Sequence, residues 1–275
     1  PLIDMFPIYL NFKLYFTKIL FNNGRIFSKE DISDAIQIHN DGIGKFYHMK
    51  SLKNNQKDFT YLNELINAET NEIKLENDIV LNIANNEQKT FKNGIKIDRN
   101  DLVIDGNGHI IDAQGFTQIF RCTGKNITIK NIILKNGYAK YSGGGSGGAI
   151  YHNGGDLTIT DSTLNNNTAQ NGGAIYNEEG ELTIVKSALN NNATGGLGGA
   201  IYHNGGDLTI TDSKLTENTA TYGGGAIYKN WKGELTILYS ILAGNTAQGT
   251  GLHFGGGAIH NYDGRLTITE STLTG

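Results

Sequence analysis

A row of acidic residues recurs immediately before the tripeptide Leu-Thr-Ile, and its carboxylates are the first groups in the sequence that could serve a ligand. Hard cations such as Ca²⁺ prefer carboxylate oxygens, so acidic residues one repeat apart could form a line of calcium sites. The alternative, which the sequence favours, is that they are hydrophilic turn residues, because repulsion between neighbouring carboxylates in water costs only about 1 kcal/mol. The predicted metal residues are Asp156, Glu181, Asp207 and Glu234. No other cofactor is predicted.

Aromatic residues form a second recurring group, each directly after the segment Gly-Gly-Ala-Ile. If the isoleucine points inward, the alternation of a β-strand sends the aromatic side chain outward. Stacked phenol faces could then hold sugar rings, and a self-packed structural ladder is the alternative. His260 takes the aromatic position in the last copy. The predicted ligand-binding residues are Tyr151, Tyr176, Tyr202 and Tyr228.

Asparagines recur in a third pattern, Leu-x-x-Asn, for which we predict a structural role. Stacked asparagine amides hydrogen-bond one another along the stacking direction. The predicted ladder is Asn167, Asn192, Asn218 and Asn245. His152 and His203 also share a column, but at two repeats apart, about 9.6 Å, they are too distant to share one metal ion. We predict no catalytic residue.

The elements that position these residues follow from the spacing of the repeats. Leu-Thr-Ile begins at residues 157, 182, 208, 235 and 266. Its apolar residues alternate with polar ones as in short strands, and Gly and Asn separate the pieces as tight turns require. A period near 25 residues indicates a solenoid. Three short strands per repeat make one coil of a parallel β-helix, so we predict an all-β fold of about seven coils of about 25 residues.

The chain before the repeats has a different composition and divides into two regions. Residues 1–57 are predicted to be an irregular leader with a short helix at Ser28–His39. Residues 58–70 are predicted to be a capping helix, with an apolar stripe of Leu62, Leu65 and Ile66 that covers the first coil. Residues 71–275 form the repeat domain. Because Gly275 falls within a coil, we expect the array to be truncated.

Composition excludes several classes of protein. The formal net charge is −4, and a nucleic-acid partner would need a basic face. The single cysteine, Cys122, excludes an internal disulfide and a cysteine-based zinc cluster. No stretch of about 20 apolar residues is free of charge, so we predict no membrane span.

The repeats resemble those of known surface proteins. Gly-Gly-Ala-Ile followed by Leu-x-x-Asn resembles the GGAI/FxxN repeats of chlamydial polymorphic membrane proteins, although Leu replaces Phe in every copy. The segments Leu102–Asp112 and Asn126–Gly137 resemble the first coils of adhesin-like surface proteins of methanogenic archaea. This resemblance implies a right-handed parallel β-helix of the pectin-lyase-like kind. It also implies an extracellular or cell-surface rod that attaches to glycans or to surface proteins of other cells.

Two alternatives stay open. A polysaccharide lyase or hydrolase could use the same fold, but it would need clustered carboxylates and a basic residue at non-repeating positions. Arg121 and Arg265, the candidate basic residues, lie in different coils, and the insertion at Gly249–Gly255 is the local break in the repeat. The sequence therefore leaves catalysis uncertain and favours a protein that is not an enzyme. A passive structural spacer is the second alternative.

Overall fold

The structure, a computed structural model of the chain, describes residues 36–40, 45–49, 57–139, 145–249 and 255–275. The chain divides into two units, Pro1–Asn55 and Gln56–Gly275. In the first unit, β1 (Ile36–Asn40) pairs with β2 (Lys45–Met49) as an antiparallel hairpin.

This hairpin corrects part of the sequence analysis. The predicted helix at Ser28–His39 is wrong for residues 36–39, which lie in β1, and its remainder falls outside the described residues. The segment Ile36–His39 alternates apolar and polar residues with period two, which favours a strand. The helix was predicted from apolar residues at helical spacing, but the segment at its end also fits the two-residue period of a strand.

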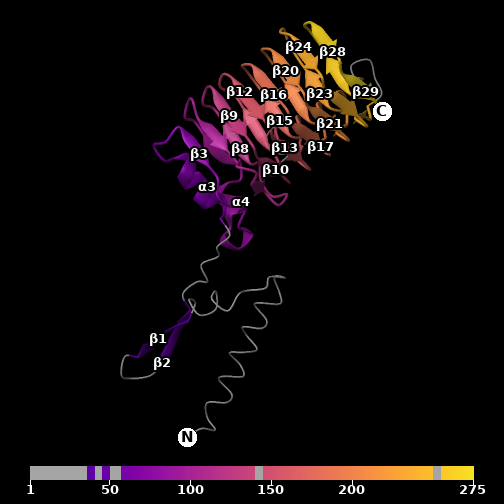
Figure 1. Cartoon of the computed structure of the whole chain (residues 1–275). Helices are drawn as coiled ribbons and strands as arrows, with labels where there is room; N and C mark the ends of the chain where they lie inside the picture. The colour runs from indigo at the N-terminus through magenta and orange to yellow at the C-terminus, as the bar shows by residue number, and fades with distance from the viewer. Residues whose placement is uncertain (1–35, 41–44, 50–56, 140–144, 250–254) are drawn as a thin grey trace. The chain divides into compact units, whose positions relative to one another are not determined.

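The second unit is a parallel β-helix, as predicted, and Figure 1 shows its coils stacked in sequence order. We number its sheets in the order in which one coil visits them. Sheet 1 contains β3 (Glu72–Lys74), β6 (Val103–Asp105), β9 (Ile127–Lys130), β12 (Leu157–Thr160), β16 (Leu182–Val185), β20 (Leu208–Thr211), β24 (Leu235–Leu238) and β28 (Leu266–Thr269). Sheet 2 contains β4 (Ile79–Val80), β7 (Ile110–Asp112), β10 (Ile133–Lys135), β13 (Thr163–Asn165), β17 (Ala188–Asn190), β21 (Lys214–Thr216), β25 (Ile241–Ala243) and β29 (Thr272–Thr274).

Two further sheets complete the coil. Sheet 3 contains β14 (Thr168–Ala169), β18 (Ala193–Thr194), β22 (Thr219–Ala220) and β26 (Thr246–Ala247). Sheet 4 contains β5 (Ile95–Ile97), β8 (Phe120–Cys122), β11 (Ile150–His152), β15 (Ile175–Asn177), β19 (Ile201–His203), β23 (Ile227–Lys229) and β27 (Ile259–Asn261). The central coils therefore have four strands instead of the predicted three, because two residues after each Asn of Leu-x-x-Asn also pair between coils.

The register of the sheets builds the core from identical neighbours. In sheet 1, Leu157 pairs with Leu182 and Leu182 pairs with Leu208, and all three side chains are fully buried. The threonine after each leucine points outward and is only partly buried. Each coil thus contributes a few buried Leu and Ile residues that are shielded mainly by the coils on either side.

Glycines permit the tight corner before sheet 4. Gly172 adopts φ = +60°, a conformation that side chains with a Cβ rarely adopt. A Cβ on the next residue, Gly173, would collide with the carbonyl oxygen of Gly199 in the following coil. The pair Gly-Gly is therefore required by the turn and by the close approach of two coils.

A short helix covers the first coil. Helix α3 (Phe59–Ile66) is capped by Asp58, whose side chain accepts a hydrogen bond from the Tyr61 backbone at 3.1 Å. Phe59, Leu62 and Ile66 are buried against the core. The 3₁₀ turn η1 (Ile83–Asn85) and the short helix α4 (Glu87–Thr90) follow β4. The apolar stripe predicted for this helix shifts slightly, because Leu65 is only partly buried and Phe59 takes a place in the core.

Candidate ligand-binding surface

The aromatic residues that follow Gly-Gly-Ala-Ile form one continuous stack along the outer face of sheet 4. Strand register places Tyr151, Tyr176 and Tyr202 opposite one another in β11, β15 and β19. Their ring centroids lie 5.5 Å and 4.8 Å apart, and the rings are within 3° of parallel. Tyr228 and His260 extend the stack at 5.3 Å and 4.7 Å. We call these five side chains the tyrosine ladder.

Stacking covers the faces of the ladder rings. Tyr176, Tyr202 and Tyr228 each have a ring on both faces, and the Arg121 guanidinium lies 4.2 Å from the ring centroid of Tyr151 in a cation–π contact. A sugar ring cannot lie flat on these inner tyrosines. A ligand would contact the ladder at ring edges and hydroxyl groups instead of ring faces. The ligand-binding role of the tyrosines stays a prediction.

A row of polar side chains runs beside the ladder. Asn204 Nδ2 donates to Glu178 Oε1 at 3.0 Å, and Asn230 Nδ2 donates to Asn204 Oδ1 at 3.0 Å. Asn230 Nδ2 also donates to the Tyr202 hydroxyl at 3.4 Å. Burial, and then a hydrogen bond to Glu178, raise the pKa of Tyr176, so its hydroxyl is protonated at neutral pH. We call Glu178, Asn204 and Asn230 the polar row.

Buried polar side chains lie on the inner side of the same strands. His152, Asn177 and His203 are fully buried in successive coils. His152 Nδ1 lies 2.6 Å from Asn177 Oδ1, and Asn177 Nδ2 lies 3.1 Å from His203 Nδ1. Burial lowers the pKa of His203 to about 4, and it also lowers the pKa of His152. Both imidazoles are therefore neutral at pH 7 and act as hydrogen-bonding core residues.

The predicted calcium residues lie on the turns that lead into sheet 1. Asp156 Oδ1 accepts the backbone N–H of Glu181 at 3.1 Å, and Asp207 Oδ1 accepts that of Glu234 at 2.7 Å. Glu234 Oε1 also lies 3.5 Å from Arg265 Nε. In the part of the chain that the structure describes, no three His, Cys, Asp or Glu side chains gather closely enough to hold a metal ion. Calcium binding stays a prediction.

The Leu-x-x-Asn asparagines form a buried amide ladder at the turn between sheets 2 and 3. The backbone and side-chain N–H groups of Asn167 both donate to Asn192 Oδ1 at 3.0 Å. Asn192 donates in the same way to Asn218, and Asn218 to Asn245. These bonds satisfy backbone groups inside the solenoid, which is a structural role.

A second ladder, of serines, was missed by the sequence analysis. The backbone N–H of Ser162 donates to Ser187 Oγ at 3.1 Å, and Ser187 Oγ donates to the Val185 carbonyl at 2.8 Å. The signal was available, because a serine follows the second residue after each Leu-Thr-Ile. The members are Ser162, Ser187, Ser213, Ser240 and Ser271.

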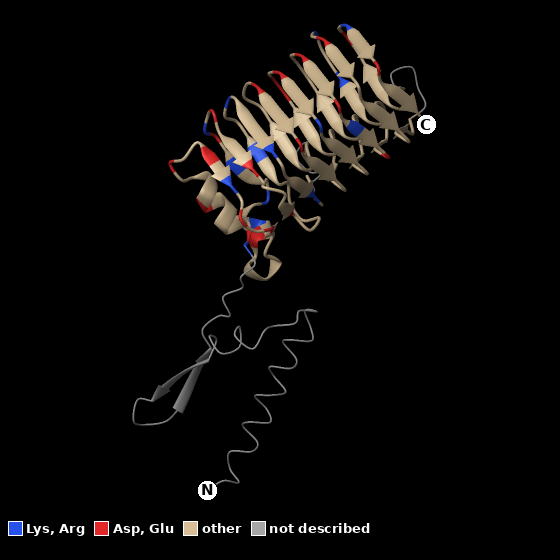
Figure 2. Ribbon diagram, in the orientation of Figure 1, with Lys and Arg blue, Asp and Glu red and all other residues tan. Residues whose placement is uncertain are grey.

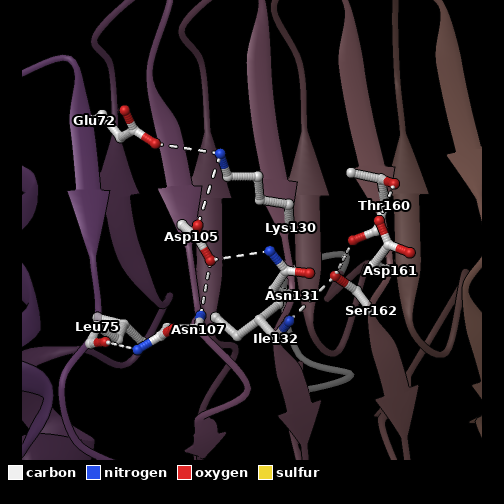
Figure 3. A network of polar contacts seen from close by, with 10 residues as sticks. All are labelled: Glu72, Leu75, Asp105, Asn107, Lys130, Asn131, Ile132, Thr160, Asp161 and Ser162. Atoms are coloured by element: carbon white, nitrogen blue, oxygen red, sulfur yellow. Dashed lines mark hydrogen bonds and ion pairs between the residues drawn. The ribbon is translucent and has the colours of Figure 1, made fainter.

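The first coils carry an ionic network instead of a repeated ladder, and Figure 3 shows it on sheet 1. Lys130 Nζ lies 3.2 Å from Glu72 Oε1 and 3.7 Å from Asp105 Oδ2. Burial acts to raise the pKa of Asp105, but hydrogen bonds from Asn107 and Asn131 and the charge of Lys130 outweigh it, and the pKa is lowered. Figure 2 shows few charged residues on the strands of the later coils, where acidic residues mark the turns.

Two family models match parts of the chain. Residues 54–172 match a pectate lyase-like adhesive domain. Residues 212–229 match the Chlamydia polymorphic membrane protein repeat. The chain is similar to adhesin-like β-helix proteins. No curated protein and no solved structure matches it.

These matches indicate where the protein acts. Both families support an adhesin-like surface protein, whereas the likeness to archaeal proteins stays an expectation from the sequence alone. None of the helices in the described ranges is long and apolar enough to cross a membrane.

Proposed function

We propose that this chain is an extracellular or cell-surface adhesin whose later coils attach to glycans of other cells. The observation that carries the proposal is the strip formed by the tyrosine ladder and the polar row on one side of the rod. Hydroxyl groups, amides and aromatic edges at a regular spacing suit a polymer of hydroxylated rings. The adhesive-domain match, which covers residues 54–172 and therefore only Tyr151 of the ladder, supports attachment as a role of the chain.

The edge geometry makes the tyrosine hydroxyls the groups that contact the glycan. Tyr176 and Tyr202 are partly buried, and their faces are covered by neighbouring rings. Burial raises the pKa of both phenols, so both hydroxyls stay protonated. The Tyr202 hydroxyl can donate to sugar oxygens, and the Tyr176 hydroxyl, which is hydrogen-bonded to Glu178, can accept from sugar hydroxyls. Glu178 and Asn204 add an acceptor and an amide at the same level of the rod.

The test is a glycan-array screen of the purified chain, with and without calcium, in which the same glycans are analysed for cleavage products. Binding without cleavage is the expected result. Cleavage would replace the proposal by a polysaccharide lyase or hydrolase, and the absence of both would leave a structural spacer.

A pair of double variants locates the binding surface. Tyr176→Phe with Tyr202→Phe removes two hydroxyls but keeps the stack, and we expect binding to weaken by about tenfold or more. Thr183→Val with Thr209→Val removes two outward hydroxyls from sheet 1 in the same coils and should leave binding unchanged. Equal binding by both double variants would remove the ladder as the site.

The calcium prediction has a separate test. If the acidic row binds Ca²⁺, millimolar calcium raises the melting temperature, and Asp156→Asn with Asp207→Asn reduces that rise. Asparagine can still accept the backbone hydrogen bonds of Glu181 and Glu234 through its carbonyl oxygen. The melting temperature without calcium therefore reports folding, and the calcium-dependent rise reports the metal. No rise in the native chain would discard the calcium line.

A further inference from the structure

One turn beside the tyrosine ladder departs from the repeat. Six positions separate the ladder residue from the next Leu-Thr-Ile leucine in the other coils, as from Tyr202 to Leu208, but seven separate Tyr228 from Leu235. Asn230 keeps the regular backbone bond to the His203 carbonyl at 2.8 Å. The extra residue therefore falls between Asn230 and Leu235, in the turn that contains Trp231, the single tryptophan of the chain.

Trp231 is held in an uncommon conformation. Its φ is +57°, a region that bulky residues rarely adopt and that persists only where the surroundings enforce it. The enforcing group is Lys229, a fully buried side chain whose ammonium donates to the carbonyls of Trp231 and Lys232, each at 3.2 Å. Burying an ammonium group is costly unless it is paired. The two hydrogen bonds of Lys229 compensate for this cost and hold the turn in one conformation.

The tryptophan ring is presented to solvent. Trp231 is 64% exposed. Within the described residues, its ring makes no aromatic or cation–π contact, whereas every tyrosine of the ladder has a partner on at least one face. Tyr262, which is 65% exposed, follows on the same turn one coil further, where its backbone N–H donates to the Lys229 carbonyl at 2.9 Å.

The surroundings indicate what would cover this ring. The neighbours of Trp231 along the chain are Asn230 and Lys232, and the Asn230 amide belongs to the polar row. Two exposed aromatic rings, Trp231 and Tyr262, among polar residues do not make the large contiguous apolar patch that marks most protein interfaces. It suits a ligand with one apolar face and a rim of hydroxyls, in which the face stacks on the ring and the hydroxyls reach the amides.

We infer that Trp231 is the stacking platform for one pyranose ring of a glycan that follows the tyrosine ladder, with Lys229 as its positioning residue. This inference rests on the proposed function and supplies what the ladder lacks. The ladder offers ring edges and hydroxyls, and Trp231 offers an open aromatic face at the end of the same strip.

The single tryptophan makes the test specific, because all tryptophan fluorescence of the chain reports this turn. The full chain is titrated with cello-, chito- and galacturonic acid oligosaccharides, which present neutral, acetylated and acidic pyranose rings. Binding is followed by tryptophan emission and, independently, by calorimetry. We expect a saturable emission change with at least one series, and about tenfold weaker calorimetric affinity for Trp231→Ala. Trp231→Phe, which keeps a ring, should lose less.

A matched control separates the platform from general effects of the turn. Tyr239 is also a large exposed aromatic residue with positive φ, at 53% exposure and +51°, on the turn between sheets 1 and 2. Tyr239→Ala should bind as the native chain does. Calorimetric binding with no emission change, and equal affinity for Trp231→Ala, would overturn the platform and leave the proposed function standing. The absence of calorimetric binding with every series would overturn both.

Discussion

The first coils and the later coils of this β-helix are held together by different kinds of contact. In residues 57–137 the side-chain contacts that link one coil to another join residues of different types, as where Lys130 lies between Glu72 and Asp105. The Arg99 side chain donates to backbone carbonyls at the end of α3, including that of Ile66 at 2.9 Å. In residues 145–275 the same side chain repeats from coil to coil, as asparagine, serine or tyrosine.

This difference separates two tasks. Contacts between unlike groups fit only one place, so they define an end of the rod and its helical cap. Contacts between like groups fit at every coil, so they let the array extend and place any outward residue in a straight row. The candidate binding surface accordingly lies on the later coils, where Tyr176 and Tyr202 repeat, and Arg121 marks its border.

The largest expected effect comes from breaking a ladder of like groups. Asn192→Ala removes the acceptor of two hydrogen bonds and the donor of two more. Because buried partners are left unsatisfied, we expect a loss of about 4 kcal/mol in the free energy of unfolding. Denaturant unfolding measures it. Asn190→Ala, which removes one hydrogen bond from Thr216, should cost about 1 kcal/mol, and equal losses would contradict the role of the ladder.

Acid should destabilise the later coils. The pKa of His203 in the folded chain is about 4, below the value of about 6.5 for a free histidine. The unfolded chain therefore takes up the proton first, so this stability is complete above about pH 6.5 and falls as the pH drops to about 4, by about 3 kcal/mol.

A variant isolates the histidine from the many carboxylates that also titrate. His203→Asn introduces the residue found at Asn177, one coil earlier in the same column. Its free energy of unfolding should fall less than that of the native chain between pH 7 and pH 4. Identical pH profiles for the two chains would show that His203 does not carry this dependence.

A single substitution in the helical cap of the first coils should reduce the free energy of unfolding less than the loss of a ladder asparagine. The buried Glu87 carboxylate accepts backbone hydrogen bonds from Thr60 at 2.7 Å and from Asn82 at 2.6 Å, which ties α3 to α4. Glu87→Gln replaces one acceptor oxygen by a donor, and we expect a loss of about 2 kcal/mol. Amide exchange should accelerate in α3 and not in β16. The exposed Glu64→Gln on the same helix is the control, and acceleration in both variants alike would refute this role.

The smallest expected effect comes from the ionic network of the first coils. Lys130→Met removes the ion pairs to Glu72 and Asp105, but exposed pairs contribute little and are screened by salt. Its destabilisation should be smaller than that of Asn192→Ala or Glu87→Gln and should shrink at high salt. Lys186→Met, at a turn where no ion pair joins it to Asp161 or Asp212 among the described residues, should show no such salt dependence. A large, salt-independent loss for Lys130→Met would contradict this account.

The sequence predicts most of what repeats. Leu157, Leu182 and Leu208 recur at nearly constant spacing, and this recurrence alone implied stacked parallel strands, inward leucines and a column of asparagines. The outward direction of Tyr176 followed from the same alternation. Because each copy of the repeat supports the assignment of the others, the strands could be assigned without relying on the β-propensity of individual residues.

What does not repeat was harder to predict. The stacking distance of the tyrosines depends on how the coils pack, so the sequence could not show that the faces of Tyr176 are covered. Glu87 and Arg99 act across about 30 residues on unlike partners, with no second copy to reveal them. Trp231 was overlooked because one inserted residue hardly changes the period, although its conformation changes what the turn exposes.

The most direct test of the central claim is hydrogen–deuterium exchange of the whole chain with and without the glycan that the array identifies. If the later coils are the binding surface, the glycan slows exchange in β15, β19 and β23 and in the turn around Trp231, and it leaves α3 and the first strands of sheet 1 unchanged. Protection confined to the first coils, or to sheet 2, would contradict the account.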